Sequence, residues 1–238
     1  MDNFEPNFEN EKPIVIKLNQ VRALLVPEVI AKSFLFMFGA LLITAFAACT
    51  TDAKVVLYLF STNTYYLIFA AEIAIVIISN IAISKNNPIL ATISYVIYSY
   101  LTGVLLSVIF LVYTTTSITA VFFITAAVFA IMAIYGLTTD ADLSSVGNIC
   151  LMGLIGIILS GLVNMFFLKS TMFDTIICCI GVLVFVGLTA YDTQKIKERV
   201  ETSTDDTVLT MALFGGFELY LDFVNLFLKL LKLFGKRK

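Results

Sequence analysis

Seven long apolar segments dominate the chain and limit the folds that are open to it. Each has about twenty residues, the length that an α-helix needs to cross the hydrocarbon core of a bilayer. Short polar connections such as "SKNNP" and "TTDADLSS" separate them. Because unpaired backbone groups are costly in lipid, these segments are expected as helices. The expected spans are residues 33–50, 65–83, 89–113, 118–137, 147–168, 174–191 and 208–228. The sequence therefore predicts an all-α integral membrane bundle of seven transmembrane helices.

The composition supports lipid as the solvent and excludes several functions. The chain is 60% hydrophobic and only 13% charged, whereas a soluble domain needs more polar surface to cover its core. Its net charge of −2 provides no basic field for nucleic acid. The chain has no histidine, which excludes histidine metal sites and Ser-His or Cys-His catalysis. We therefore expect a lipid bilayer as partner, no nucleic acid, no resident cofactor and no enzymatic activity.

The placement of lysine and arginine predicts the orientation. Basic residues gather in a polar N-terminal arm, residues 1–31, and in the connection 192–207. Both lie inside if the N-terminus is cytoplasmic, as the positive-inside rule prefers. The basic C-terminal "KLLKLFGKRK" then lies outside if the seventh segment crosses fully, and inside if that segment is re-entrant. We expect seven crossings, so the arm is followed by a transmembrane domain over residues 32–238.

The last segment, "FGGFELYLDFVNLFLKLLK", carries charge at positions that should lie in the membrane. Glu218, Asp222, Asn225 and Lys229 are spaced by four, three and four residues, which places them on one face of a helix. On an insertion scale an apolar residue gains roughly 0.3–0.6 kcal/mol and an acid costs roughly 3 kcal/mol. Two acids thus cancel most of the free energy that the apolar residues of this segment gain on insertion. We expect this helix inside the bundle, with its polar stripe facing a shared, wetted interior.

Asp192 closes the sixth segment and also needs a partner. If Asp192 and Asp222 meet in a poorly solvated place, both cannot ionise cheaply and the pair would share a proton. When both are ionised they repel each other or bind a cation, and carboxylate oxygens suit Ca²⁺, so the same two residues are the candidate metal ligands. The alternative is that Asp192 is an interfacial cap facing water and Asp222 is a polar residue bonded to a neighbouring helix.

Further charged side chains lie inside the second apolar segment and at the ends of the second and sixth. Glu72 lies inside the second segment without a compensating charge. It is either a proton or cation relay, or a buried neutral acid bonded to Asn80 or to a facing hydroxyl. Lys85 follows that segment and either turns inward to latch an acid or stays in solvent. The charged run 195–199, which begins at Lys195, is expected as a solvated helix end near lipid headgroups.

Two stretches carry a resemblance to a known family. "GLTAYDTQKIKERV" followed by "ELYLDFVNLFLKLLKLFG" resembles the end of the Bax inhibitor-1 family of membrane proteins, in its bacterial branch. Residues 132–164 and 101–110 resemble other spans of that family, and the likeness extends from about residue 30 to the end. The Tyr-Asp-Thr-Gln and Leu-Tyr-Leu-Asp-Phe stretches are specific in combination, because hydrophobicity explains neither.

The resemblance implies a bundle whose last helix is central and wrapped by the first six. It also implies a pH-sensitive calcium leak with a paired-aspartate sensor, whose positions match Asp192 and Asp222. The family's second-span acid matches Glu72, and Lys85 stands near the position where the family has an arginine latch. Lysine lacks the fork of arginine, so a latch there would be weaker.

Further consequences of the resemblance concern the membrane and the remaining polar residues. Glu218 is an additional acid without an assigned role. Together with Asn225 it is a candidate for a relay or for modulating the sensor. Ca²⁺ and protons are the expected ligands, and a bacterial inner membrane is the expected location.

Two other functions compete with a gated leak. The first is a non-conducting regulator that binds a membrane protease or stress-response partner through its arm and loops. The second, an intramembrane hydrolase, is disfavoured because the chain has no histidine base, no HExxH motif and no nucleophile elbow. An aspartyl protease could use two facing acids, but the glycine-flanked aspartate motif of such enzymes is missing.

Overall fold

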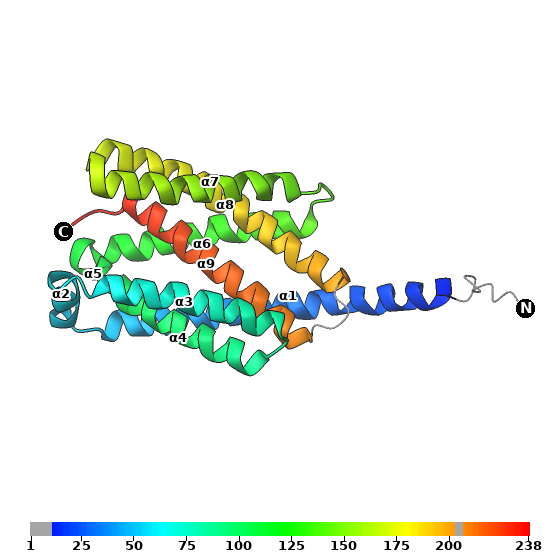
Figure 1. Cartoon of the computed structure of the whole chain (residues 1–238). Coiled ribbons are helices and arrows are strands. Elements are labelled where there is room, and N and C mark those ends of the chain that lie inside the picture. The colour runs from blue at the N-terminus through cyan, green and yellow to red at the C-terminus, as the bar shows by residue number, and fades with distance from the viewer. Residues whose placement is uncertain (1–10, 203–206) are drawn as a thin grey trace, which may run out of the picture.

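The computed structural model describes residues 11–202 and 207–238, and these residues are nearly all helical (Figure 1). Seven helical segments are long and apolar enough to cross a membrane. The helices are α1 (Glu11–Thr50), α2 (Ala53–Ser61), α3 (Tyr65–Ser84), α4 (Pro88–Leu106), α5 (Ile109–Val112), α6 (Thr115–Thr138), α7 (Ser144–Val163), the π-helical turn η1 (Asn164–Leu168), α8 (Thr171–Thr202) and α9 (Val208–Phe234). The all-α fold class is confirmed.

Local sequence explains where several of these helices begin. The side chain of Asn87 accepts a hydrogen bond from the backbone of Leu90, and Pro88 occupies the first turn of α4. Thr114 caps α6 and Thr207 caps α9 in the same manner. Such caps satisfy N–H groups that have no partner within the helix, which matters most where little water is available.

The outer limits of three spans differ from those that hydropathy predicted. The first span has no break at the boundary placed at residue 31, because α1 runs unbroken from Glu11 to Thr50. α8 continues to Thr202, so much of the predicted connection 192–207 is helical. α9 likewise continues to Phe234. Hydropathy marks where lipid ends, whereas a helix continues until a residue or turn stops it.

α9 is the most buried of the spans. About 72% of its apolar window is buried, against at most 33% for any other span. It packs against α1, α3, α4, α6 and α8, whereas α7 packs mainly on α8. Figure 1 shows α9 running between α6 and α8 on one side and α1, α3 and α4 on the other. That the last helix is wrapped by all six others stays a prediction.

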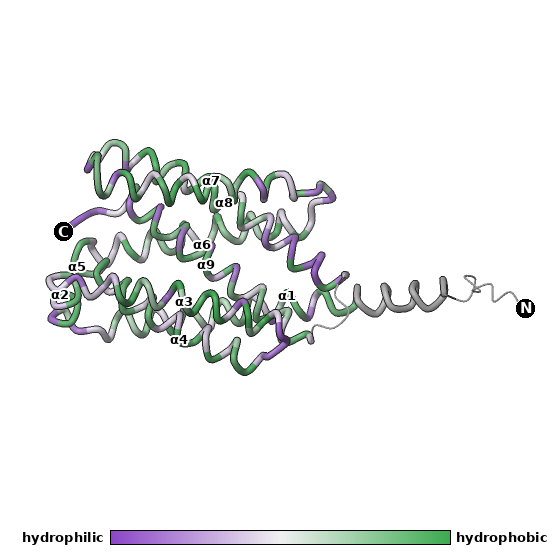
Figure 2. The backbone as a smooth tube through the Cα atoms, viewed as in Figure 1, coloured by the Kyte–Doolittle hydropathy of each residue, from purple (hydrophilic) through white to green (hydrophobic). Residues whose placement is uncertain are grey.

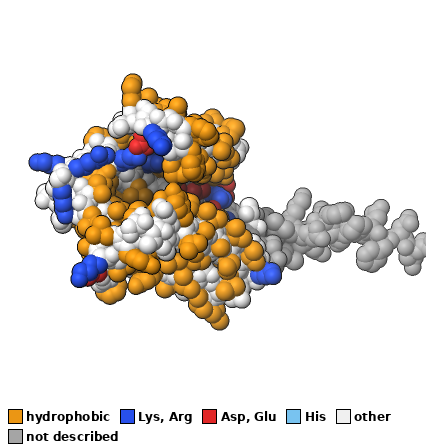
Figure 3. Space-filling view, turned by 60° about the vertical axis from the view of Figure 1, so that its left-hand side comes forward, with side chains coloured by type: hydrophobic (Ala, Val, Ile, Leu, Met, Phe, Trp, Pro, Cys, Tyr) orange, Lys and Arg blue, Asp and Glu red, His pale blue; other side chains and the backbone are white. Residues whose placement is uncertain are grey.

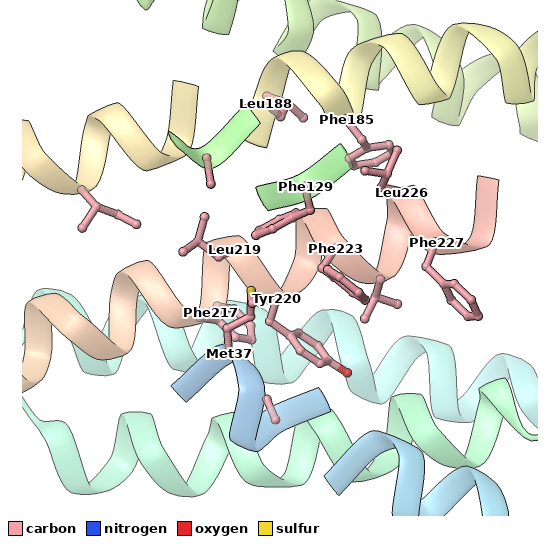
Figure 4. Close-up of a cluster of buried hydrophobic side chains, with 14 of the residues drawn as sticks. Met37, Phe129, Phe185, Leu188, Phe217, Leu219, Tyr220, Phe223, Leu226 and Phe227 are labelled. Carbon is pink, nitrogen blue, oxygen red and sulfur yellow. The ribbon is translucent and has the colours of Figure 1, made fainter. Parts of the chain in front are cut away.

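The apolar residues of α9 form the centre of the hydrophobic core. Figure 4 shows Phe217, Tyr220, Phe223 and Phe227 of α9 among side chains from α1, α6 and α8. The rings of Phe129 and Phe223 meet edge to face, with centroids 5.4 Å apart. Such aromatic pairs add about 0.5–1.5 kcal/mol beyond the area that they bury.

The outward faces of the other spans are largely apolar. Figure 2 shows hydrophobic residues along most of the length of the spans and hydrophilic residues mainly at the connections. Large side chains such as Leu67, Ile131 and Leu183 are mostly exposed on the molecule by itself. Apolar surface of this extent suits contact with lipid tails.

The position of the C-terminal tail indicates whether the last segment crosses the membrane. α9 is one continuous helix, and the tail that follows it pairs with the connection between α5 and α6. The backbone N–H of Thr114 donates to the carbonyl of Lys236 at 3.0 Å, and that of Lys238 donates to Val112 at 3.0 Å. The C-terminus and the first turn of α1 lie at opposite ends of the molecule (Figure 1). A re-entrant last segment does not fit this arrangement.

Candidate functional site

A cavity of about 430 Å³ lies between α3, α7, α8 and α9. Apolar side chains from all four helices form most of its wall, including Phe69 of α3 and Leu154 of α7. Its charged and amide-bearing lining comes from α8 and α9: Asp192, Lys195, Glu218, Asp222, Asn225 and Lys229. In the space-filling view, acidic and basic side chains gather around a recess in a largely apolar surface (Figure 3).

Asp192 and Asp222 meet in the wall of this cavity. Their carboxyl groups lie near each other across the interface between α8 and α9, so the charge of one acts on the other. Asp222 is 4% exposed, and the side chain of Asp192 is 13% exposed. Neither carboxyl therefore faces bulk water, which sets aside the alternative of Asp192 as a cap in solvent.

The hydrogen bonding of this pair bears on its protonation. Two ionised carboxylates have no donor to offer each other, so these two could form a hydrogen bond only if one of them carried a proton. Oδ2 of Asp222 is buried and has no hydrogen-bond partner among the described residues. A proton shared by the pair would place a donor beside this carboxyl. The role of the pair as a pH sensor stays a prediction.

Lys195 does not form a solvated helix end, and that interpretation was wrong. Its Nζ lies 2.7 Å from Oε1 of Glu218 and 3.9 Å from Oδ1 of Asp192. Lys195 follows Asp192 by three residues on α8, and Glu218 precedes Asp222 by four on α9. Helical periodicity places both on the same faces as the aspartates. Once the aspartates are paired, this spacing is the signal that could have identified the ion pair.

Lys85 lies outside this arrangement. It directly follows α3, is exposed, and does not line the cavity. The cation that contacts the acids is Lys195, so the latch drawn from Lys85 has no contact to support it in the described part of the chain. Glu218, whose role the sequence left open, is the main partner of that cation.

Glu72 belongs to a separate polar cluster between α1, α3, α4 and α9. Its Oε1 accepts a hydrogen bond of 2.8 Å from Oγ1 of Thr102, so it is bonded to a facing hydroxyl. Asn80, the other partner considered, donates instead to the backbone carbonyl of Val76. Nearby, the hydroxyls of Thr44 and Tyr220 are 2.7 Å apart. A relay role for Glu72 stays a prediction.

Asn225 and Lys229 continue the polar stripe toward the C-terminal end of α9. The side-chain amide of Asn225 donates to the backbone carbonyl of Leu221 at 2.8 Å. The aliphatic stem of Lys229 passes close to Gly181 of α8, so a Cβ at this glycine would lie 3.1 Å from two carbons of the stem. Near the end of the helix, Lys232 forms an ion pair of 2.5 Å with Asp174.

The cluster is suited to holding or releasing small cations. Carboxylate oxygens are ligands for protons and for hard cations such as Ca²⁺. Within residues 24–202 and 207–238, no three acidic or thiol side chains lie close enough together to hold a metal ion. Metal binding by Asp192 and Asp222 therefore stays a prediction.

Comparisons with known proteins match most of the chain. A family model described as "Inhibitor of apoptosis-promoting Bax1" matches residues 26–238. The chain is 44% identical over 214 residues to the inner membrane protein YbhL of Escherichia coli, covering 87% of this chain and 91% of that protein. It is 41% identical over 214 residues to an uncharacterised protein of Borreliella burgdorferi, with coverage of 88% and 92%. It is 40% identical over 210 residues to one of Rickettsia prowazekii, with coverage of 87% and 89%.

Proposed function

Because the chain belongs to the bacterial branch of the Bax inhibitor-1 family, we propose that it is a pH-sensitive calcium leak gated by a proton shared between Asp192 and Asp222. It is an integral membrane protein with seven apolar spans. The proposal places it in a bacterial inner membrane with a cytoplasmic N-terminus. It has no catalytic role in this proposal, and Ca²⁺ and protons are its ligands.

The observation that carries the proposal is the close approach of two carboxyls that are buried at the wall of one cavity. While one proton is shared, attraction between the carboxyls helps to hold α9 against α8. When that proton leaves, two buried negative charges repel each other. The repulsion favours separation of the helices and entry of water and cations into the cavity.

The surroundings of the pair contain groups that adjust its charge. Lys195 of α8 is the nearest cation and favours ionised carboxylates, whereas Glu218 of α9 disfavours additional negative charge. Tyr191 of α8 lines the same cavity. Cys150 of α7 is near enough to both aspartates to be affected by their charge. The proposed gate requires the pair to release its shared proton within the physiological pH range.

A flux assay tests the proposal directly. The full chain is reconstituted into vesicles of phosphatidylethanolamine and phosphatidylglycerol that enclose a calcium indicator, and the initial rate of Ca²⁺ entry is measured. We expect the rate to rise between about pH 6 and pH 8 as the shared proton leaves. Asp192→Asn and Asp222→Asn should each hold the rate low and independent of pH. Asp140→Asn, which removes an exposed acid, is the matched control.

The proposal fails if the protein leaks equally across this pH range with and without the aspartate substitutions. Absence of any protein-dependent flux, together with specific capture of a membrane protease or stress-response protein in detergent, would instead favour the non-conducting regulator. In that case the aspartate substitutions should leave partner capture unchanged.

A further inference from the structure

The ammonium of Lys195 lies among the acids of the cavity wall. It contacts Glu218 at 2.7 Å and Asp192 at 3.9 Å, and Glu218 lies one turn before Asp222 on α9. The side chain of Glu218 is 21% exposed and that of Lys195 is 36% exposed, so both are partly withdrawn from solvent. One ammonium thus contacts two carboxyls of a group of three.

Aromatic rings also surround this ammonium. Nζ of Lys195 is 5.1 Å from the centroid of the Phe214 ring and 5.9 Å from that of Tyr191. The guanidinium of Arg199 lies over the same Phe214 ring, with Cζ 4.2 Å from its centroid. Cations over ring faces are attracted by the ring quadrupole. Lys195 is therefore held in place from several directions, although a lysine stem is flexible.

Two oxygens of the acidic group have no hydrogen-bond partner among the described residues. They are Oε2 of Glu218 and Oδ2 of Asp222, and both atoms are buried. Asp222 is 4% exposed and lines the cavity. A buried carboxylate oxygen without a donor is costly, and a cation in the cavity could satisfy it. These oxygens point to a cation site that the present arrangement leaves incomplete.

We infer that Lys195 is a tethered competitor of a divalent cation for the acidic group formed by Asp192, Glu218 and Asp222. While its ammonium is on Glu218, part of the negative charge is neutralised and a diffusing cation meets little net attraction. When the ammonium swings away, Glu218 and Asp222 can both turn their free oxygens to the cation. The competition requires Lys195 to move, since no three acids are close enough for a metal ion in the present arrangement of the described residues.

Other charged groups near the acidic group cannot replace Lys195 in this role. Arg199 acts on Glu218 from a position over Phe214. Lys229 lines the same cavity but lies seven residues beyond Asp222 on α9, about 10 Å along the helix axis. Lys195 is the cation in direct contact with two of the three acids. An effect of Lys195 on Ca²⁺ flux rests on the proposed calcium leak, whereas its effect on Ca²⁺ binding does not.

The test compares Lys195→Gln with the original protein and with Lys197→Gln, which removes the same charge two residues away. Thermal unfolding in detergent is followed while CaCl₂ is titrated, because a ligand of the folded state raises Tm. We expect Lys195→Gln to lower the half-saturating Ca²⁺ concentration by about tenfold, and Lys197→Gln to leave it unchanged. Lys195→Arg, which keeps the charge, should lower it by about twofold at most.

A double variant checks that the acids provide the site. Lys195→Gln with Glu218→Gln should lose the gain in Ca²⁺ affinity, because one of the three carboxylates is then missing. If Lys195→Gln does not fold, Lys195→Met takes its place, since it keeps an unbranched apolar stem beside Phe214. An unchanged half-saturating concentration in the folded variant overturns the inference.

The flux assay separates failure of this inference from failure of the proposed function. Ca²⁺ stabilisation of Lys195→Gln without any flux at any pH would retain the site and reject the calcium leak. Conversely, pH-dependent flux in the original protein, with the same Ca²⁺ dependence of flux and of Tm in Lys195→Gln, would retain the leak and reject the tethered competitor.

Discussion

Oγ1 of Thr102 on α4 donates a hydrogen bond of 2.8 Å to Oε1 of Glu72 on α3. This bond joins two neighbouring spans inside the bundle, where Glu72 is 7% exposed. Glu72 does not line the cavity that holds Asp192 and Asp222. The second-span acid and the aspartate pair therefore occupy different polar regions of the same bundle.

This separation predicts how a neutral Glu72 should behave. In Glu72→Gln the amide oxygen can still accept from Thr102, and no group of the aspartate cavity changes. We expect the pH dependence of Ca²⁺ entry into vesicles to stay within about twofold of that of the original protein. Loss of the pH dependence in this variant would contradict the separation and would support a relay through Glu72.

The bond between Tyr220 and Thr44 should contribute to stability. Tyr220 is completely buried at the centre of α9, and its hydroxyl lies 2.7 Å from that of Thr44. Tyr220→Phe removes the hydroxyl and keeps the ring, at an expected cost of about 0.5–1.5 kcal/mol in the free energy of unfolding. Tyr100→Phe, at an exposed tyrosine, should be neutral. Denaturant titration in detergent measures the free energy of unfolding of both variants. Equal values would refute a stabilising role for the bond between Tyr220 and Thr44.

Close packing of α6 against α8 depends on Gly136. A Cβ at this position would overlap the backbone carbonyl of Ala190, which cannot move aside without shifting α8. Gly136→Ala should therefore destabilise the protein by about 1–3 kcal/mol. Gly156→Ala is the matched control, because a Cβ there meets nothing within 4 Å. A Tm of Gly136→Ala equal to that of Gly156→Ala would rule out this contact.

Asp222→Asn should change how stability depends on pH. In the original protein the shared proton leaves as the pH rises, and two buried carboxylates then repel each other. The side-chain amide introduced by this substitution would donate to Asp192 at every pH. We expect the variant to have the higher Tm at about pH 8 and a similar Tm at about pH 5. If the Tm of both proteins fell in parallel as the pH rose, the result would argue against a shared proton.

The position of the tail predicts the sidedness of the C-terminus. α9 runs the length of the bundle, and the tail pairs with the connection between α5 and α6. With a cytoplasmic N-terminus, residue 238 should be extracytoplasmic. In a variant whose four native cysteines are replaced, Lys238→Cys should react with a membrane-impermeant maleimide in intact cells. Labelling only after the cells are broken would show that residue 238 is cytoplasmic. It would contradict either the predicted orientation or the full crossing of α9.

Much of the candidate site follows from the sequence. The spacing of Glu218, Asp222, Asn225 and Lys229 places them on one helical face, and the cost of acids in lipid turns this face inward. The same cost predicts that Asp222 and Asp192 lie together. The role of Lys195 was missed, because a charged run at the end of an apolar segment is typical of solvated headgroup contacts.

The helical spans and their apolar outer faces are determined by the chain itself, because hydropathy and backbone hydrogen bonding act locally along each segment. The choice of partners was decided only when the helices assembled. Whether Lys195 meets Glu218, or Glu72 meets Thr102, depends on the rotation and depth of each helix. These are set by close contacts such as that between Gly136 and Ala190, which join residues far apart in the chain.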